Sequence, residues 1–150
     1  EEDAALAYTG PMPFTDVAAG SQSEKYVGYA YSKGYTNGYS ATTFRPSQTV
    51  TAGQYMEFML RALGYSSAAN TDLSGTLDNA YANGVITSGE LTALQSGTFL
   101  RADLVYVSYY ALDATMAGTG ITLRDTLMNK GTFTSAQVSA AAALVPGARK

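Results

Sequence analysis

A helix-ending signal recurs along this 150-residue chain, and it constrains the fold more than any other feature. The segment AYSKGY at 30–35 returns as AYANGV at 80–85, with Ala, Tyr and Gly in the same places at an offset of 50. The segments that follow, 51–63 and 100–112, align at an offset of 49, and both end in Ala-Leu. Because a fixed period indicates repeated supersecondary units, the sequence predicts an array of similar helical pairs.

Local capping signals define the first pair of helices. Ser21 and Glu24 have the spacing of a capping box, so a helix should begin directly after Ser21, and Gly34 stands where a left-handed residue would end it. Thr51 and Gln54 form a second capping pair, which predicts another helix. That helix carries an apolar stripe at helical spacing, made of Tyr55, Met56, Met59, Leu60 and Leu63.

The segment between these helices has the signals of a loop. Asn37-Gly38 marks a turn, and Pro46 prevents a helix from continuing. Residues 39–50 could hold a short extended pair, but we favour an irregular loop. Asp16, which lies in the motif FTDV, is expected to be a turn or cap residue that holds the first helix in place.

A third, partial unit follows the second one. NGVITSGEL at 83–91 resembles KGTFTSAQV at 130–138, and in each a Thr-x-x-Glu/Gln cap follows a glycine. Pro146-Gly147 should end the last helix. We therefore expect one all-α domain over 1–150, a pseudo-symmetric array of helix-loop-helix repeats packed as a helical bundle. Stacking would bury the apolar faces of the units in a common interior; the units span about 14–65, 72–113 and 121–145.

Composition excludes several classes of function. The chain has no cysteine and no histidine, which removes thiol nucleophiles and the usual zinc ligands, so we expect no metal and no cofactor. Its net charge is −3 and its nine basic residues are scattered, so no basic stripe exists for a nucleic acid. The longest apolar run, 104–112, is about half of the ~20 residues that a membrane span requires. We expect neither a nucleic-acid partner nor a membrane span.

Five motifs follow one another in the first unit: FTDV at 14–17, Gly34, NGY at 37–39, FRPSQTVT at 44–51 and LRALGY at 60–65. The second unit carries NGVIT and LRADLV. In this order, the motifs resemble the S-layer homology (SLH) family. The resemblance is strong over 14–65, weaker over 72–113 and faint over 121–145.

The resemblance implies a non-catalytic cell-surface module that anchors an exported bacterial protein. SLH repeats dock onto cell-wall polysaccharide, often an anionic, pyruvate-bearing secondary polymer, and three of them usually form one pseudo-threefold, mostly helical body with grooves between neighbours. The expected location is extracellular, at the cell wall. EEDAALA at 1–7 would then be the start that remains after removal of a signal peptide.

The family signature Thr-Arg-Ala-Glu is changed in both units. The first unit reads TAGQ, with Ala52 in place of the arginine. The second reads LRAD, which keeps Arg101 and an acid, Asp103, but puts Leu100 at the cap position. The resemblance therefore implies at most one groove of family type, at Arg101. The alternatives are an exposed arginine whose stem lies on apolar surface and, for Asp103, a helix N-terminal acid.

Further candidate ligand contacts lie in the loop of the first unit. Tyr35 and Tyr39 are the tyrosines best placed to stack on sugar rings, whereas most others should pack inside the fold. Arg45 offers a guanidinium in the same loop; the alternative is an exposed surface residue with no binding role. No catalytic residue is predicted.

Two other functions remain open. Loss of the arginine in the first unit and truncation of the third favour a repurposed SLH-like module for protein–protein interaction or oligomerisation. A glycoside hydrolase is the least favoured function, because its paired carboxylates would have to come from residues that lie in no distinctive motif, namely Glu57, Asp72, Asp78 and Glu90.

Overall fold

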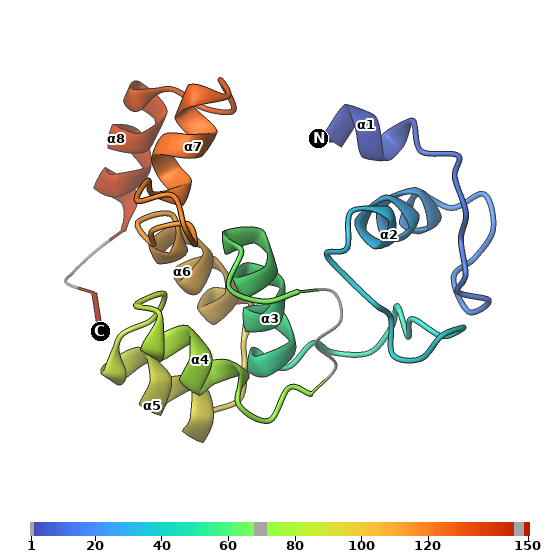
Figure 1. The fold of residues 1–150 in the computed structure, drawn as a ribbon, viewed down its shortest axis with the longest axis horizontal. Helices are drawn as coiled ribbons and strands as arrows, with labels where there is room; N and C mark the ends of the chain where they lie inside the picture. The colour runs from blue at the N-terminus through green and yellow to red at the C-terminus, as the bar shows by residue number, and fades with distance from the viewer. Residues whose placement is uncertain (1, 68–71, 146–148) are drawn as a thin grey trace.

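The computed structural model describes residues 2–67, 72–145 and 149–150, and their secondary structure is helical (Figure 1). No β-strand occurs in these ranges, although an isolated antiparallel bridge joins Thr115 and Thr122. The predicted all-α class is confirmed, whereas the pseudo-symmetric packing of repeats stays a prediction. The helices are α1 (Glu2–Leu6), α2 (Gln22–Ser32), α3 (Ala52–Leu63), α4 (Thr76–Ala82), α5 (Ser88–Ser96), α6 (Arg101–Ala111), α7 (Leu123–Asn129) and α8 (Ser135–Leu144).

The predicted caps begin these helices. The Thr51 hydroxyl accepts a hydrogen bond from the Gln54 N–H at 3.2 Å, and the Gln54 side chain accepts one from the Thr51 N–H at 3.0 Å. Ser21 caps α2 by accepting from the Glu24 N–H, but the Glu24 carboxylate reaches Gly20 instead of closing a full box. Side-chain caps also precede α5, α7 and α8, at Thr87, Thr122 and Thr134.

The same helix end occurs after α2, α4 and α7. Each of these helices is followed by a glycine in the left-handed region, with φ between 69° and 72°: Gly34, Gly84 and Gly131. The next residue then donates its N–H to a carbonyl five positions back, at 2.9 Å in each case: Tyr35 to Ala30, Val85 to Ala80 and Thr132 to Leu127. This local motif satisfies carbonyls that the helix leaves unpaired, and it underlies the period in the sequence.

Among the described residues, the buried apolar side chains form two clusters, not one. The smaller cluster contains Val27 of α2 together with Phe14 and Val17. The larger one contains Ala80 of α4, and its other members come mainly from α3 and α6: Met56, Leu60, Leu63, Val85, Ile86, Val107, Ala111 and Ala114. The expectation that both helical pairs share a common interior is therefore wrong for α2.

The reason for this division lies in the first residues of the chain. No helix is predicted over 1–7 from the sequence, yet α1 forms there and packs against α2. Ala5 is buried in this contact, and the ring of Tyr8 meets that of Tyr29 edge-on at 6.2 Å between centroids. Figure 1 shows α1 and α2 side by side, with α3 between them and the remaining helices.

Helix α3 is the centre of the larger cluster. It packs against α4 and α6, and Leu60 is completely buried there. The Tyr55 hydroxyl hydrogen-bonds to the Ser108 hydroxyl at 2.6 Å, which ties α3 to α6. By contrast, α7 and α8 contribute no buried side chain. The predicted stop at Pro146-Gly147 lies outside the described residues.

Candidate functional site

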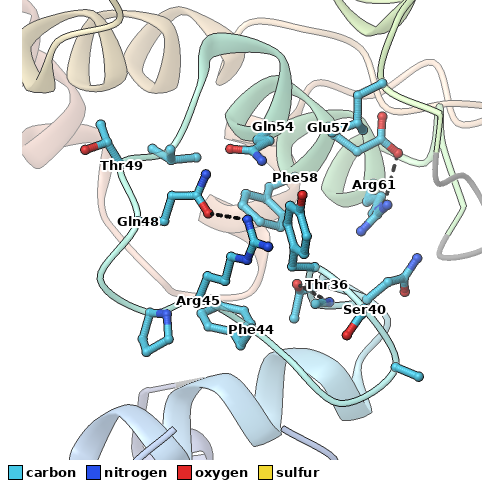
Figure 2. A pocket seen from close by; sticks show the side chains of 17 residues that line it. Thr36, Ser40, Phe44, Arg45, Gln48, Thr49, Gln54, Glu57, Phe58 and Arg61 are labelled. Atoms are coloured by element: carbon cyan, nitrogen blue, oxygen red, sulfur yellow. Dashed lines mark hydrogen bonds and ion pairs between the residues drawn. The ribbon is translucent and has the colours of Figure 1, made fainter. Parts of the chain in front are cut away.

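A cavity of about 520 Å³ lies between the loop at 36–50 and one side of α3 (Figure 2). The loop wall includes Tyr39, Arg45 and Gln48, and the helix wall includes Gln54 and Phe58. The predicted irregular loop is confirmed, because no strand forms between 39 and 50. The cavity thus combines aromatic rings with amide and guanidinium groups.

Arg45 and Tyr39 form one surface within this cavity. The guanidinium carbon of Arg45 lies 3.3 Å from the centroid of the Tyr39 ring, which is close enough for a cation–π contact. Nη1 of Arg45 also donates to the Gln48 side-chain oxygen at 3.4 Å, and Figure 2 shows both side chains on the loop side of the cavity. Arg45 is exposed, and 57% of the Tyr39 surface is accessible. A ligand in the cavity can therefore meet a ring and a fork of N–H donors together.

Asp16 fixes the backbone of this loop. Its two carboxylate oxygens accept hydrogen bonds from the N–H groups of Phe44 and Arg45, at 2.8 and 2.7 Å. These two bonds hold the pKa of Asp16 below its usual value, with the bond from Phe44 the larger cause. Arg45 has a φ of 62°, in the left-handed region that residues other than glycine rarely occupy. Asp16 therefore holds the loop, and the expectation that it holds the first helix is corrected.

A buried ion pair lies on the helix side of the cavity. Glu57 is only 2% exposed, and its carboxylate accepts a hydrogen bond from Nε of Arg61 at 3.1 Å. The second oxygen of Glu57 accepts from the Thr76 hydroxyl at 3.3 Å, and Nη1 of Arg61 donates to the Tyr35 carbonyl at 3.1 Å. This network joins α3 to the end of α2 and to the start of α4. Glu57, one of the carboxylates considered for hydrolysis, therefore has a structural ion-pair partner.

Two of the three site residues predicted in the loop line the cavity, and the third does not. Tyr39 and Arg45 both line the cavity. Tyr35 is half-buried beside it, where its carbonyl accepts the bond from Arg61.

The predicted residues of the second unit lie apart from the cavity, at the start of α6. Asp103 accepts a hydrogen bond from the Leu100 N–H at 2.8 Å, as a helix N-terminal acid does. It borders a hollow of about 20 Å³, which is room for no more than a water molecule. Arg101 is exposed and forms no side-chain hydrogen bond or ion pair with any residue in the described ranges. The binding roles of Arg101 and Asp103 stay predictions.

Several residues of the cavity were not singled out as ligand contacts from the sequence. Gln54 was recognised only as a cap, and Gln48, Phe58 and Arg61 were given no binding role. The spacing of Glu57 and Arg61, four positions apart, is the signal that could have marked an ion pair at this wall. The rest depends on how the loop folds back against α3.

Residues 13–56 match the family model for the S-layer homology domain. This segment contains the whole loop wall of the cavity and the first turn of α3, but it is less than a third of the chain. The expected second and third units lie outside it and stay predictions. S-layer homology domains are binding modules that anchor proteins to cell-wall polymers at the cell surface. Searches of curated proteins and of solved structures found no match to the chain.

Residues 2–67, 72–145 and 149–150 contain no group of three or more acidic, histidine or cysteine residues arranged to hold a metal ion. Within the same ranges, no helix has the length and apolar character needed to cross a membrane.

Proposed function

We propose that this chain is a non-catalytic, extracellular module that binds a cell-wall polysaccharide in the cavity between the loop at 36–50 and α3, and so anchors an exported protein. The observation that carries the proposal is the stacking of Arg45 on Tyr39 inside that cavity, within the segment that matches the S-layer homology domain.

The chemistry of the cavity suits a sugar. A volume of about 520 Å³ lies within the range of small-molecule sites, so it can hold a short piece of a glycan. Aromatic faces such as Tyr39 pack against the apolar faces of sugar rings, and the amides of Gln48 and Gln54 can donate to and accept from hydroxyl groups. The guanidinium of Arg45 favours a sugar that carries an acidic substituent.

Arg101 is a second candidate contact for the polymer. It presents an exposed guanidinium at the start of α6, and it does not line the cavity. A polymer could therefore contact either position. The two arginines can be tested separately because they lie on different elements.

Co-sedimentation with wall sacculi tests the proposal. Sacculi that keep their secondary polymer should sediment the protein, and sacculi stripped of that polymer should not. Arg45→Ala should weaken binding about 10- to 100-fold, because a charge-assisted hydrogen bond contributes about 1.5–3 kcal/mol. Lys25→Ala, which removes an exposed charge on α2, is the matched control and should bind normally. Equal binding by the Arg45 and Lys25 variants would contradict the proposal.

A second candidate function is association with a protein partner or with another copy. The observation that favours it is the large exposure of apolar side chains on α6 and α8: Val105 is 61% and Leu144 82% accessible. Size-exclusion chromatography with light scattering tests this function. A concentration-dependent mass together with no affinity for sacculi would favour it over polymer binding.

A further inference from the structure

A second buried glutamate pairs with an arginine from the far end of the chain. Glu90 of α5 is 2% exposed, and both of its carboxylate oxygens accept hydrogen bonds from Arg149, from Nε at 2.9 Å and from Nη2 at 2.8 Å. Nη2 of Arg149 also donates to the Val85 carbonyl at 2.7 Å. The hydrogen bond to Glu90 is the main cause that raises the pKa of Arg149. A bidentate pair of this kind requires the planar fork of an arginine.

Lys150, the next residue, is held in place through hydrogen bonds of its backbone. The Lys150 N–H donates to the Tyr106 hydroxyl at 2.7 Å, and the Thr87 hydroxyl donates to the Lys150 main-chain oxygen. Gly89 lies directly beneath, because a Cβ built there would come within 3.0 Å of the Lys150 carbonyl carbon. Residues 149 and 150 thus fit a site with matched polar groups and with space left by a glycine.

The first unit contains an equivalent arrangement made by a single helix. Tyr35 and Val85 both follow a left-handed glycine, at an offset of 50, and the carbonyl of each accepts a hydrogen bond from an arginine. In the first unit this arginine is Arg61 of α3. At the offset of 49, α6 carries Tyr110 in its place.

The guanidinium of Arg149 fills that missing position. Its central carbon lies 5.0 Å from the centroid of the Tyr110 ring, and its Nη2 reaches the same type of carbonyl that Arg61 reaches. A residue close to α6 in space, but 39 positions beyond Tyr110 in sequence, therefore supplies the arginine that α6 lacks.

We propose that Glu90, the Val85 carbonyl, Tyr106 and Tyr110 form an arginine-binding site, which this chain fills with its own Arg149-Lys150. The site accepts an arginine-bearing basic peptide when the Arg149 guanidinium no longer occupies it. The contacts that hold this segment are non-covalent and involve only two of its residues, Arg149 and Lys150. A separate peptide that carries Arg-Lys can therefore make the same contacts. An unfilled site leaves the Glu90 carboxylate without the guanidinium that pairs with it, which favours rebinding of an arginine. The site uses no residue of the cavity at Arg45.

The test uses the full chain with Arg149→Ala and the peptide N-acetyl-Arg-Lys. The peptide should bind the variant at least about tenfold more tightly than it binds the parent chain, where the tethered segment competes at high effective concentration. It should also raise the Tm of the variant in a dose-dependent way. N-acetyl-Lys-Lys should do neither, because an ammonium group cannot form the bidentate pair.

Two further variants make the outcome decisive. Arg149→Lys keeps the charge and should also bind N-acetyl-Arg-Lys, so it replaces the alanine variant if that chain does not fold. Adding Glu90→Gln to either variant should abolish the response to the peptide. Amide chemical shifts around Val85 and Glu90 report the binding directly. No shift change at saturating peptide, or an equal response to the Lys-Lys peptide, would overturn the inference.

Discussion

The carboxylate of Asp16 accepts a hydrogen bond from the backbone N–H of Arg45 at 2.7 Å. A residue that precedes α2 therefore fixes the backbone of a loop residue 29 positions later. The bond helps to hold Arg45 in its left-handed conformation, with its guanidinium over the Tyr39 ring. The cavity between the loop at 36–50 and α3 thus depends on a contact made outside its own walls.

Asp16→Asn should loosen this loop in a pH-dependent way. The pKa of Asp16 is lowered in the folded chain. The Asp16 carboxylate therefore stabilises the fold fully above the unfolded pKa, and this stabilisation is lost as pH falls through the folded pKa. The difference in Tm between the parent chain and the variant should therefore be largest near about pH 7 and should vanish well below about pH 4. Thermal unfolding across that range measures it. A difference that stays constant down to about pH 2 would show that the carboxylate charge is not the cause.

Gly38→Ala should distort the turn that starts the loop. Gly38 has a φ of 73°, and an added Cβ would overlap the Phe14 ring and come within 2.9 Å of the Thr43 carbonyl oxygen. The left-handed conformation alone costs about 1 kcal/mol for a residue with a side chain, and the overlap adds to this. Gly118→Ala, at a φ of 70° with nothing within 4 Å, is the matched control and should show only the conformational cost. Equal losses in denaturant unfolding would mean that the overlap is relieved without cost.

Glu57→Gln should destabilise the fold strongly. The substitution removes the carboxylate that pairs with the buried guanidinium of Arg61, and breaking a buried ion pair costs about 3–5 kcal/mol. The comparison is Asp113→Asn, because the carboxylate of Asp113 pairs with Arg124 at 2.7 Å but is 48% exposed. For Asp113→Asn, the free energy of unfolding should fall by less than about 1 kcal/mol. Similar free energies of unfolding for the two variants would contradict a structural role for the buried pair.

The local parts of this fold could be predicted from the sequence. The cap at Thr51 and the helix end at Gly34 depend on a few neighbouring residues, so their spacing alone identified them. The partner of α2 could not be predicted in this way. Helix α1 has only five residues and owes its place to packing against α2, which no local pattern encodes.

The candidate site was predicted only in part, for a related reason. Tyr39 and Arg45 were recognised because aromatic and guanidinium groups in a loop suit a sugar ligand. Tyr39 and Arg45 lie together in one cavity because the distant Asp16 accepts hydrogen bonds from the backbone of the loop. The spacing of the motifs does not reveal these bonds. Arg101 drew attention because it retains the arginine of the family signature, but a signature match does not create a cavity around it.

Titration of a purified wall-polymer fragment into the parent chain and into Arg45→Ala tests polymer binding in the cavity most directly. Tyr39→Ala serves as a second cavity variant, and Arg101→Ala tests the other candidate contact. We predict saturable binding by the parent chain and a loss of about 10- to 100-fold in affinity for Arg45→Ala, with a smaller loss for Tyr39→Ala. Unchanged affinity in both cavity variants, with loss only in Arg101→Ala, would contradict binding in the cavity and would place the site at the start of α6.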